Sequence, residues 1–267
     1  MGSRETVLVL PDSQNGFRGD EPLHDRTAWE ASLVLAELVD LDAVVLLGDM
    51  MDFSTLTKKF RKHADLVGKI GQTRDETQYW LARLTAVTPD VHTRKYLAGN
   101  HEERLNNTIV DANEDLEGLL TVNSLLGLED LGYDYIGPYG QDWPYRGVLY
   151  THGEKYAKFG GQTSAKYLAE NSLSVVFGHC HKAEYGMRRY QQKTRFAACP
   201  GTLARINGIV PGNSPNPDWQ QGLGLVHYDG ALAWYEQVPI EQGVMLFRGR
   251  AIKIKHSSKE RKRALGF

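Results

Sequence analysis

Residues 43–52 read AVVLLGDMMD, in which an unbroken apolar run at 43–47 is followed by a glycine and an aspartate. A run of this length and composition predicts a β-strand buried on both faces, and the glycine predicts a tight turn after it. A carboxylate directly after such a strand lies at the edge of the sheet, where α/β proteins place their ligand sites. The stretch therefore predicts a layered α/β fold and the position of a functional site.

The same pattern recurs toward the N-terminus. Residues 6–10 (TVLVL) form a second apolar run, which Pro11 and Asp12 close. Between the two runs, residues 26–39 carry apolar side chains at helical spacing. The order strand, helix, strand predicts a parallel pair joined by a crossover helix.

The rest of the chain changes character near its middle. We expect further strands at 93–97, 133–136, 147–150, 174–177, 187–198, 222–228 and 231–238, and further helices at 53–69, 75–87, 102–126 and 162–169. Strands and helices alternate in the first half, whereas the second half is rich in strands. The fold class predicted is α/β, with two packed mixed β-sheets flanked by helices in a single domain over residues 1–247.

Composition excludes several classes of protein. The 267 residues carry a formal net charge of −2, which gives no general attraction to nucleic acid or membranes. No apolar run is long enough to span a bilayer. Two cysteines cannot supply a disulfide framework, and a cytoplasmic location, that of the host cell for a phage protein, is expected.

Two segments are strongly basic. Residues 248–263 hold eight Lys or Arg and one acidic residue, so residues 248–267 are predicted to be a basic C-terminal tail. The tail could contact nucleic-acid phosphates or could simply be solvated. The basic group Lys58, Lys59, Arg61 and Lys62 could border the site, or could be an ordinary solvated helix face.

Candidate metal ligands follow strand after strand. The set consists of Asp12, Asp49, Asn100, His152, His179 and His181. Each alone has an ordinary explanation, since an aspartate after a strand is often a helix N-cap and a single histidine is usually structural. Together, two carboxylates, one amide and three imidazoles suit borderline divalent ions. Six ligands exceed the need of one ion with an open position, whereas two ions bridged by a carboxylate would use them all.

The segments that carry these ligands resemble the five ordered motifs of calcineurin-like metallophosphoesterases. They are Asp12-Ser13-Gln14, Gly48-Asp49-Met50-Met51-Asp52, Gly99-Asn100-His101-Glu102, Thr151-His152-Gly153 and Gly178-His179-Cys180-His181. The resemblance covers roughly residues 6 to 240, and it implies a four-layer α/β/β/α sandwich. The stretch Trp219-Gln220-Gln221-Gly222 is most similar to the phage-encoded and related bacterial branch.

The resemblance also implies roles for the ligands. Asp49 would bridge the two ions, and a hydroxide between the ions would be the nucleophile. Asp12 and His181 would hold one ion. The other would be held by Asn100, His152 and His179. Mn²⁺ is the expected metal, with Fe, Zn, Ni and Mg as alternatives.

Three more residues acquire expected roles from the resemblance. His101 would protonate the leaving oxygen, and Asp52 would orient His101 or a ligand. Arg104 could reach a phosphate oxygen, or could be a solvated helix residue. Cys180, between two ligands, is expected to pack inward because it would point the opposite way from them in an extended segment.

The first motif departs from the family pattern. Gln14 stands where the family has a second histidine. Its amide could bind an ion weakly, bind through water or not bind, and it shifts the expected preference toward Mn²⁺ or Mg²⁺. Among such proteins, those that lack this histidine are often phosphodiesterases rather than efficient monoesterases.

The expected function is a metal-dependent phosphodiesterase acting on small phosphodiesters such as 2′,3′-cyclic nucleotides. A nuclease that binds nucleic acid through the basic tail, a phosphomonoesterase or protein phosphatase, and a metal-bound binding module without catalysis are the alternatives. His101 and Asp52 argue against the last, because a binding module has no need of a proton donor. We expect no membrane association, and the sequence does not determine the oligomeric state.

Overall fold

A computed structural model describes residues 4–56, 69–113, 115, 117–118, 120–211 and 218–255. The basic group at 58–62 and most of the helix expected at 53–69 lie outside the described residues, as does the end of the predicted tail from residue 256. Within the described chain, a short 3₁₀ helix, η1 (Ser54–Leu56), precedes the first of these gaps.

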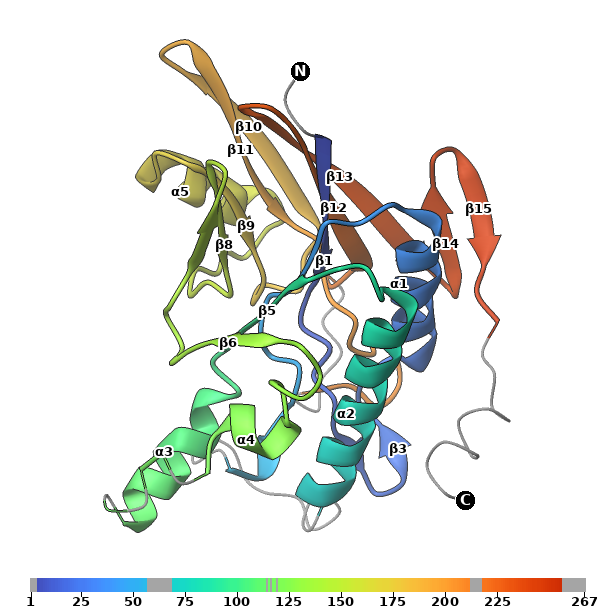
Figure 1. The fold of residues 1–267 in the computed structure, drawn as a ribbon, viewed down its shortest axis with the longest axis vertical. Coiled ribbons are helices and arrows are strands. Elements are labelled where there is room, and N and C mark those ends of the chain that lie inside the picture. The colour runs from blue at the N-terminus through green and yellow to red at the C-terminus, as the bar shows by residue number, and fades with distance from the viewer. Residues whose placement is uncertain are drawn as a thin grey trace.

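The larger sheet has the strand order β15-β14-β13-β12-β1-β4-β5-β6 among the described residues (Figure 1). Its strands are β1 (Arg4–Leu10), β4 (Ala43–Leu46), β5 (Thr93–Leu97), β6 (Asp134–Ile136), β12 (Gln221–Asp229), β13 (Leu232–Glu241), β14 (Val244–Phe247) and β15 (Arg250–Lys253). β1 and β4 are parallel, as the apolar runs predicted. β5 and β6 continue the parallel pairing, and the other strands pair antiparallel. Four residues of the predicted tail therefore belong to this sheet as β15.

The smaller sheet has the order β10-β11-β9-β8-β7. Its strands are β7 (Trp143–Tyr145), β8 (Val148–Thr151), β9 (Ser174–Phe177), β10 (Glu184–Tyr190) and β11 (Lys193–Cys199). The single strand expected at 187–198 was wrong, because the chain reverses there and forms the β10–β11 hairpin, which extends beyond the helices in Figure 1. The chain reverses at Gln191, whose φ is 54°. Glycine and asparagine are the residues that usually indicate such a turn in a sequence, and neither is present at this position.

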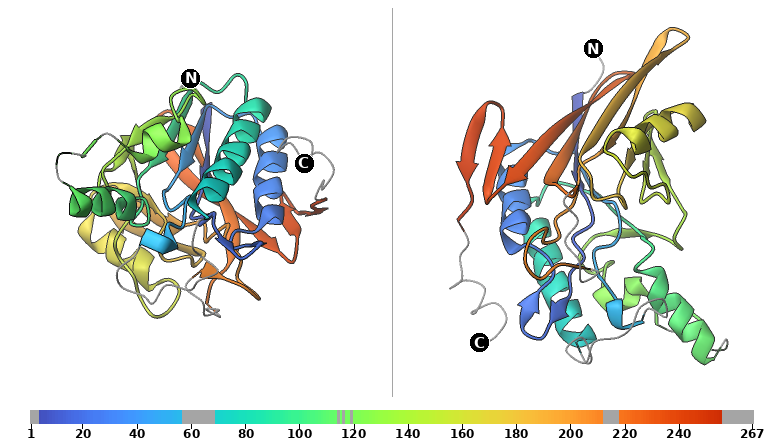
Figure 2. Two further views of the ribbon diagram at one scale, coloured as in Figure 1. Left: turned by 90° about the horizontal axis from the view of Figure 1, so that it is seen from below. Right: turned by 180° about the vertical axis from the view of Figure 1, so that it is seen from behind.

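Helices cover the outer faces of both sheets. Two helices, α1 (Arg26–Leu38) and α2 (Ile70–Val87), lie on the larger sheet, and α5 (Gln162–Glu170) lies on the smaller one (Figure 2). The indole rings of Trp29 and Trp80 stack between α1 and α2, with centroids 5.6 Å apart. Two shorter helices, α3 (Glu103–Ala112) and α4 (Val122–Leu126), follow β5, and a small β2–β3 hairpin (Phe17–Arg18 and Glu21–Pro22) precedes α1.

The central strands are buried on both faces, which explains their continuous apolar sequence. On β1, Leu8 and Leu10 pack toward the helices, whereas Val7 and Val9 pack against the smaller sheet. A third apolar cluster lies between the smaller sheet and α5. These layers confirm the predicted α/β/β/α arrangement of two sheets between helices. None of the described helices combines the length and the apolar character that a membrane crossing requires.

Candidate metal centre

The predicted ligands follow the ends of five strands, and the structure brings them together. Asp12 follows β1, Asp49 follows β4 and Asn100 follows β5 in the larger sheet. His152 follows β8, and the histidines at 179 and 181 follow β9, in the smaller sheet. The centre therefore lies where the two packed sheets meet, and each sheet supplies about half of the side chains.

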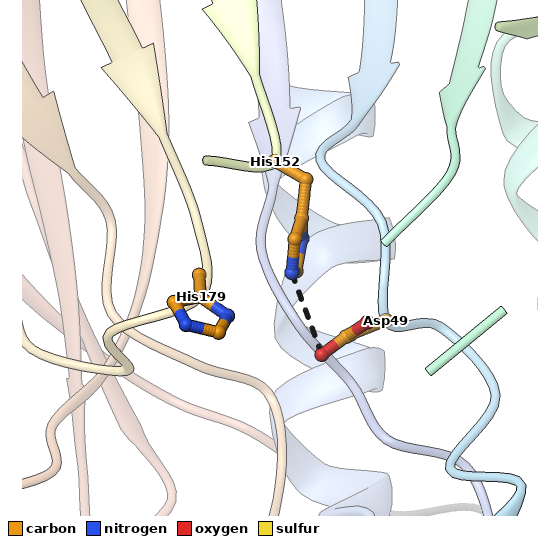
Figure 3. Close-up of side chains that lie close together, drawn as sticks. All are labelled: Asp49, His152 and His179. Atoms are coloured by element: carbon orange, nitrogen blue, oxygen red, sulfur yellow. Dashed lines mark ion pairs between the residues drawn. The ribbon is translucent and has the colours of Figure 1, made fainter. Parts of the chain in front are cut away.

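One group of four ligands is already close-packed. Asp49, His152 and His179 each offer a ligand atom, and these atoms lie within 4.8 Å of one another (Figure 3). His152 Nε2 is 3.5 Å from Asp49 Oδ2. The amide oxygen of Asn100 lies 3.1 Å from His152 Nε2 and 2.8 Å from His179 Nδ1. Oxygen and nitrogen lone pairs thus converge on one point, as binding of a divalent ion requires.

The orientation of His152 fits a metal ligand. Its Nδ1 lies 2.8 Å from the carbonyl oxygen of Leu47, which can only accept a hydrogen bond. The proton therefore belongs on Nδ1, and Nε2 presents its lone pair toward Asp49. A metal-bound histidine is commonly oriented in this way by a carbonyl behind it.

The other three ligands form a second group. Asp12 Oδ1 lies 3.3 Å from His181 Nε2, and Gln14 Nε2 lies 3.1 Å from the same ring nitrogen. The Gln14 amide oxygen is buried without a hydrogen-bond partner among the described residues. An unpartnered buried acceptor is costly, and a cation would satisfy it. The backbone N–H of His179 donates to the Asp12 carboxylate at 2.9 Å, and so connects the two groups.

Backbone strain is concentrated at these ligands. Gln14, Asp49, His179 and His181 adopt positive φ angles of 46°, 53°, 67° and 56°. The left-handed region is unfavourable for residues other than glycine and is kept where the surrounding structure enforces it, commonly at functional sites. The positive φ angles direct these four side chains toward the centre.

Close backbone approach explains the neighbouring glycines. A Cβ on Gly99 would lie 2.1 Å from Asp49 Oδ1, and one on Gly48 would lie 2.6 Å from the amide nitrogen of Gly99. Neither distance is compatible with a side chain. The two loops that carry Asp49 and Asn100 can therefore touch only because both positions are glycine.

The protonation states also suit metal binding. Burial raises the pKa of the Asp49 carboxyl, but the nearby His101 and His152 outweigh burial and hold this pKa below its ordinary value. Burial lowers the pKa of His179, and His152 lowers it further. An ionised carboxylate and a neutral imidazole are the forms that ligate a metal.

His101 and Asp52 form a pair beside the ligands. His101 Nδ1 lies 3.1 Å from Asp52 Oδ1, and its Nε2 lies 3.6 Å from Asp49 Oδ2. Burial lowers the pKa of His101, but the Asp49 and Asp52 carboxylates raise it more, so the net shift is upward. Asp52 therefore fixes the ring while the opposite nitrogen faces the centre.

Arg104 supports the same loop. It is half-buried in the first turn of α3, and its Nη1 donates to the carbonyl oxygen of Asp52 at 2.8 Å. Its contact in this structure is therefore with the loop that carries Asp52.

Cys180 packs inward, as expected, but for a different reason. The thiol is buried in the cluster between the smaller sheet and α5. The segment is not extended as we expected, since both flanking histidines have positive φ and the N–H of Cys180 donates to the Gly178 carbonyl at 2.8 Å. A tight turn, rather than strand alternation, places the cysteine and the ligands on opposite sides.

Glu102 is the important residue that the sequence analysis did not single out. Its buried carboxylate accepts hydrogen bonds from one tyrosine hydroxyl and four backbone N–H groups, those of Tyr96, Asp49, Met50, Met51 and Gly99. Burial raises the pKa of Glu102, and the charge of Asp49 raises it further. The carboxylate holds the loop after β4 in the conformation that presents Asp49. Glu102 is the N-cap residue of α3. An acidic residue at the start of a helix is common, so residue type and position alone offered no reason to assign it this role.

Comparisons with known proteins give likenesses of structure only. No known protein family matches the chain, and no curated protein matches it. Solved structures that match include Vacuolar Protein Sorting 29 from Cryptosporidium parvum, with 12% identity, a TM-score of 0.42 and coverage of 93% of this chain and 94% of that one. A metallophosphoesterase from Sphaerobacter thermophilus matches with 10% identity, a TM-score of 0.39 and coverage of 88% of both chains.

A purple acid phosphatase from yellow lupin seeds also matches. The identity is 12%, the TM-score is 0.42, and the match covers 89% of this chain. This chain spans about half of the lupin protein, 52% of its length. These are loose likenesses, and the chemistry of the site rests on this chain's own side chains.

Replacing Glu102 by glutamine tests its support of the loop. An amide has one acceptor oxygen, so its NH₂ group would face at least one set of N–H donors. Each buried donor left unpaired costs about 1–3 kcal/mol. We expect Glu102→Gln to lower the free energy of unfolding by about 2 kcal/mol or more and to weaken Mn²⁺ binding, measured by chemical denaturation and calorimetry. The control is Glu103→Gln, the next residue, which should behave as the unaltered protein. Equal stability and equal Mn²⁺ affinity in the two variants would contradict this role.

Proposed function

We propose that the chain is a metal-dependent phosphoesterase that uses two divalent ions, and that it hydrolyses small phosphodiesters such as 2′,3′-cyclic nucleotides. The observation that carries the proposal is the convergence of seven candidate ligands from five strand ends on two adjoining groups. Their number and chemistry fit two ions better than one. Mn²⁺ is the proposed metal.

The charge of the centre supports an anionic substrate. Asp12 and Asp49 carry two negative charges, and the other five ligands are neutral amides or imidazoles. Two divalent ions would therefore leave a net positive site, which attracts a phosphate ester. When bound, the ions would lower the pKa of water to supply a nucleophile and would neutralise charge on the phosphate.

In the proposed reaction, His101 serves the leaving group. The Asp52 carboxylate pairs with Nδ1 at 3.1 Å, so the imidazole is oriented with Nε2 toward the centre. A protonated Nε2 can donate to the leaving oxygen as it separates from phosphorus. The Asp52 carboxylate stabilises the protonated ring, and Arg104 in turn holds the backbone of Asp52.

Gln14 favours diesters over monoesters. A phosphomonoester carries up to two negative charges at neutral pH, whereas a diester carries one. The second group offers Asp12, Gln14 and His181, and a glutamine amide is a weaker donor than the imidazole that the resemblance leads one to expect. A weakly held second ion would neutralise a dianion poorly, and it would still suffice for a monoanion.

A nuclease is the second candidate, favoured by the basic C-terminal segment. The described part of this segment, β15, lies at the outer edge of the larger sheet, with β14, β13 and β12 between it and β1. Its basic side chains thus belong to the far edge from the ligands that follow β1 and β4. This arrangement gives long nucleic acid less support than a small substrate.

Activity on matched substrates tests the proposal. Protein stripped with a chelator should be inactive, and Mn²⁺ should restore hydrolysis of bis-nitrophenyl phosphate and 2′,3′-cAMP. The diesters should be hydrolysed faster than nitrophenyl phosphate.

Asn100→Ala should abolish turnover because it removes the amide oxygen that lies close to both His152 and His179, whereas Asn106→Ala on α3 should not. Faster hydrolysis of the monoester, or activity that survives chelation, would contradict the assignment. Cleavage of single-stranded DNA that exceeds cleavage of 2′,3′-cAMP would favour the nuclease.

The role of His101 predicts a dependence on the leaving group. His101→Asn should lower kcat for 2′,3′-cAMP by about 100-fold or more, since a ribose alkoxide needs a proton. The loss should be much smaller for bis-nitrophenyl phosphate, whose nitrophenolate leaves without one. Asp52→Asn should show the same trend more weakly, and the exposed His92→Asn serves as control. A loss of equal size on both substrates would assign His101 to another task.

The departure at position 14 has its own test. Gln14→His should tighten binding of the second Mn²⁺ in calorimetry and should raise the rate on nitrophenyl phosphate relative to the diester. Gln141→His, at an exposed position, controls for the added imidazole. If both the metal affinity and the substrate ratio stay unchanged, Gln14 does not take part in the centre.

A further inference from the structure

One partly exposed aromatic ring lies directly on a proposed ligand. The indole of Trp219 contacts the imidazole of His181 edge-on, with ring centroids 4.3 Å apart and planes at 67°. Trp219 is half-buried, unlike Trp29 and Trp80, which are fully buried core residues. Part of the Trp219 ring is therefore accessible directly beside the proposed centre. An accessible aromatic face at that place can contact the organic part of a bound substrate.

Trp219 is held in place by its two neighbours in sequence. Asp218 on one side pairs with Lys182, with 3.7 Å between carboxylate and ammonium. On the other side, the N–H of Gln220 donates to the His181 carbonyl at 3.1 Å, and the Gln220 amide oxygen accepts from the Ala183 N–H at 3.0 Å. The segment is thus fastened to the residues that follow β9, so the ring is positioned before any ligand arrives.

Lys182 fastens a second aromatic residue to the same place. This lysine is only 1% exposed, which is rare for a charged side chain. Its ammonium donates to the carbonyls of Ala157 and Lys158 at 2.9 and 2.6 Å, and it lies 4.7 Å from the centre of the Tyr156 ring. Tyr156 itself is 51% exposed. One buried charge, next in sequence to His181, therefore fixes two loops that each present an aromatic side chain.

We propose that Trp219 and Tyr156 form a stacking subsite for the base of a nucleoside phosphodiester. The inference rests on the proposed function, and it narrows the substrate class from small phosphodiesters in general to those that carry a nucleobase. A phosphate bound at the ion held by His181 would place its organic group beside Trp219. Flat aromatic rings bind bases through their faces with little dependence on which base is present.

Binding of a matched pair of ligands tests this subsite without requiring turnover. The Mn²⁺-loaded protein should bind 3′-AMP at least about ten-fold more tightly than ribose 3-phosphate, which has the same phosphate and sugar but no base. Trp219→Leu should weaken 3′-AMP binding by about ten-fold and leave ribose 3-phosphate within about two-fold. Trp219→Phe should keep part of the preference, and Tyr156→Leu should lose part of it.

Trp234→Leu is the matched control. Trp234 is 46% exposed and stacks on His227, whose partner Thr6 lies near the start of β1, whereas the centre follows the end of that strand. The Trp234→Leu variant should bind both ligands as the unaltered protein does.

Equal binding of the two ligands by the unaltered protein would overturn the inference even if diesters are hydrolysed. Equal weakening of both ligands by Trp219→Leu would also overturn it, because Trp219 would then only support His181. Absence of hydrolysis with base preference intact would instead refute the proposed function.

Discussion

One buried carboxylate, that of Glu102, accepts hydrogen bonds from four backbone N–H groups, and these bonds determine the shape of the centre. Glu102 fixes the loop after β4, and that loop places Asp49 in a left-handed conformation beside Asn100. Without this carboxylate, water could satisfy the N–H groups of the loop in many other conformations, and the strained one would not be kept. His152, His179 and Asn100 are grouped around Asp49. The second group of ligands joins them where the His179 N–H donates to the Asp12 carboxylate. The site therefore depends on a residue that touches neither metal nor substrate in the proposal.

Parts of the fold were readable from the sequence because burial on both faces leaves a clear pattern. The strands at 93–97 and 174–177 were predicted with the bounds that the structure shows, and 43–47 was one residue too long. The hairpin turn at Gln191 was missed because the two strands have no turn residues between them. β15 was missed because its sequence, with Arg250 and Lys253, resembles a solvated basic tail. β14 was missed because its apolar run is only four residues long. The order of layers depended on the continuous apolar runs, and these were correctly interpreted.

The candidate site could be predicted as far as residue type alone indicates a metal ligand. Carboxylates and imidazoles at strand ends could be collected from the sequence, and the structure brings them together. The sequence could not indicate which groups orient them, because orientation comes from contacts between distant segments. Leu47 contributes a carbonyl to His152, and Glu102 contributes acceptors to a loop some fifty positions earlier. Trp219 was noticed as part of a family-like stretch, but its contact with His181 became visible only in three dimensions.

The left-handed backbone at four of the ligands restricts how this centre can change during evolution. Asparagine, aspartate and histidine tolerate that conformation better than other side chains, and β-branched residues tolerate it least. Gln14, Asp49, His179 and His181 can therefore exchange with only a few residue types before the loops themselves must move. That short repertoire includes good donors for several metals. A lineage could thus alter its metal preference through single substitutions, while an apolar replacement that abolished the centre would carry a penalty in folding as well as in activity.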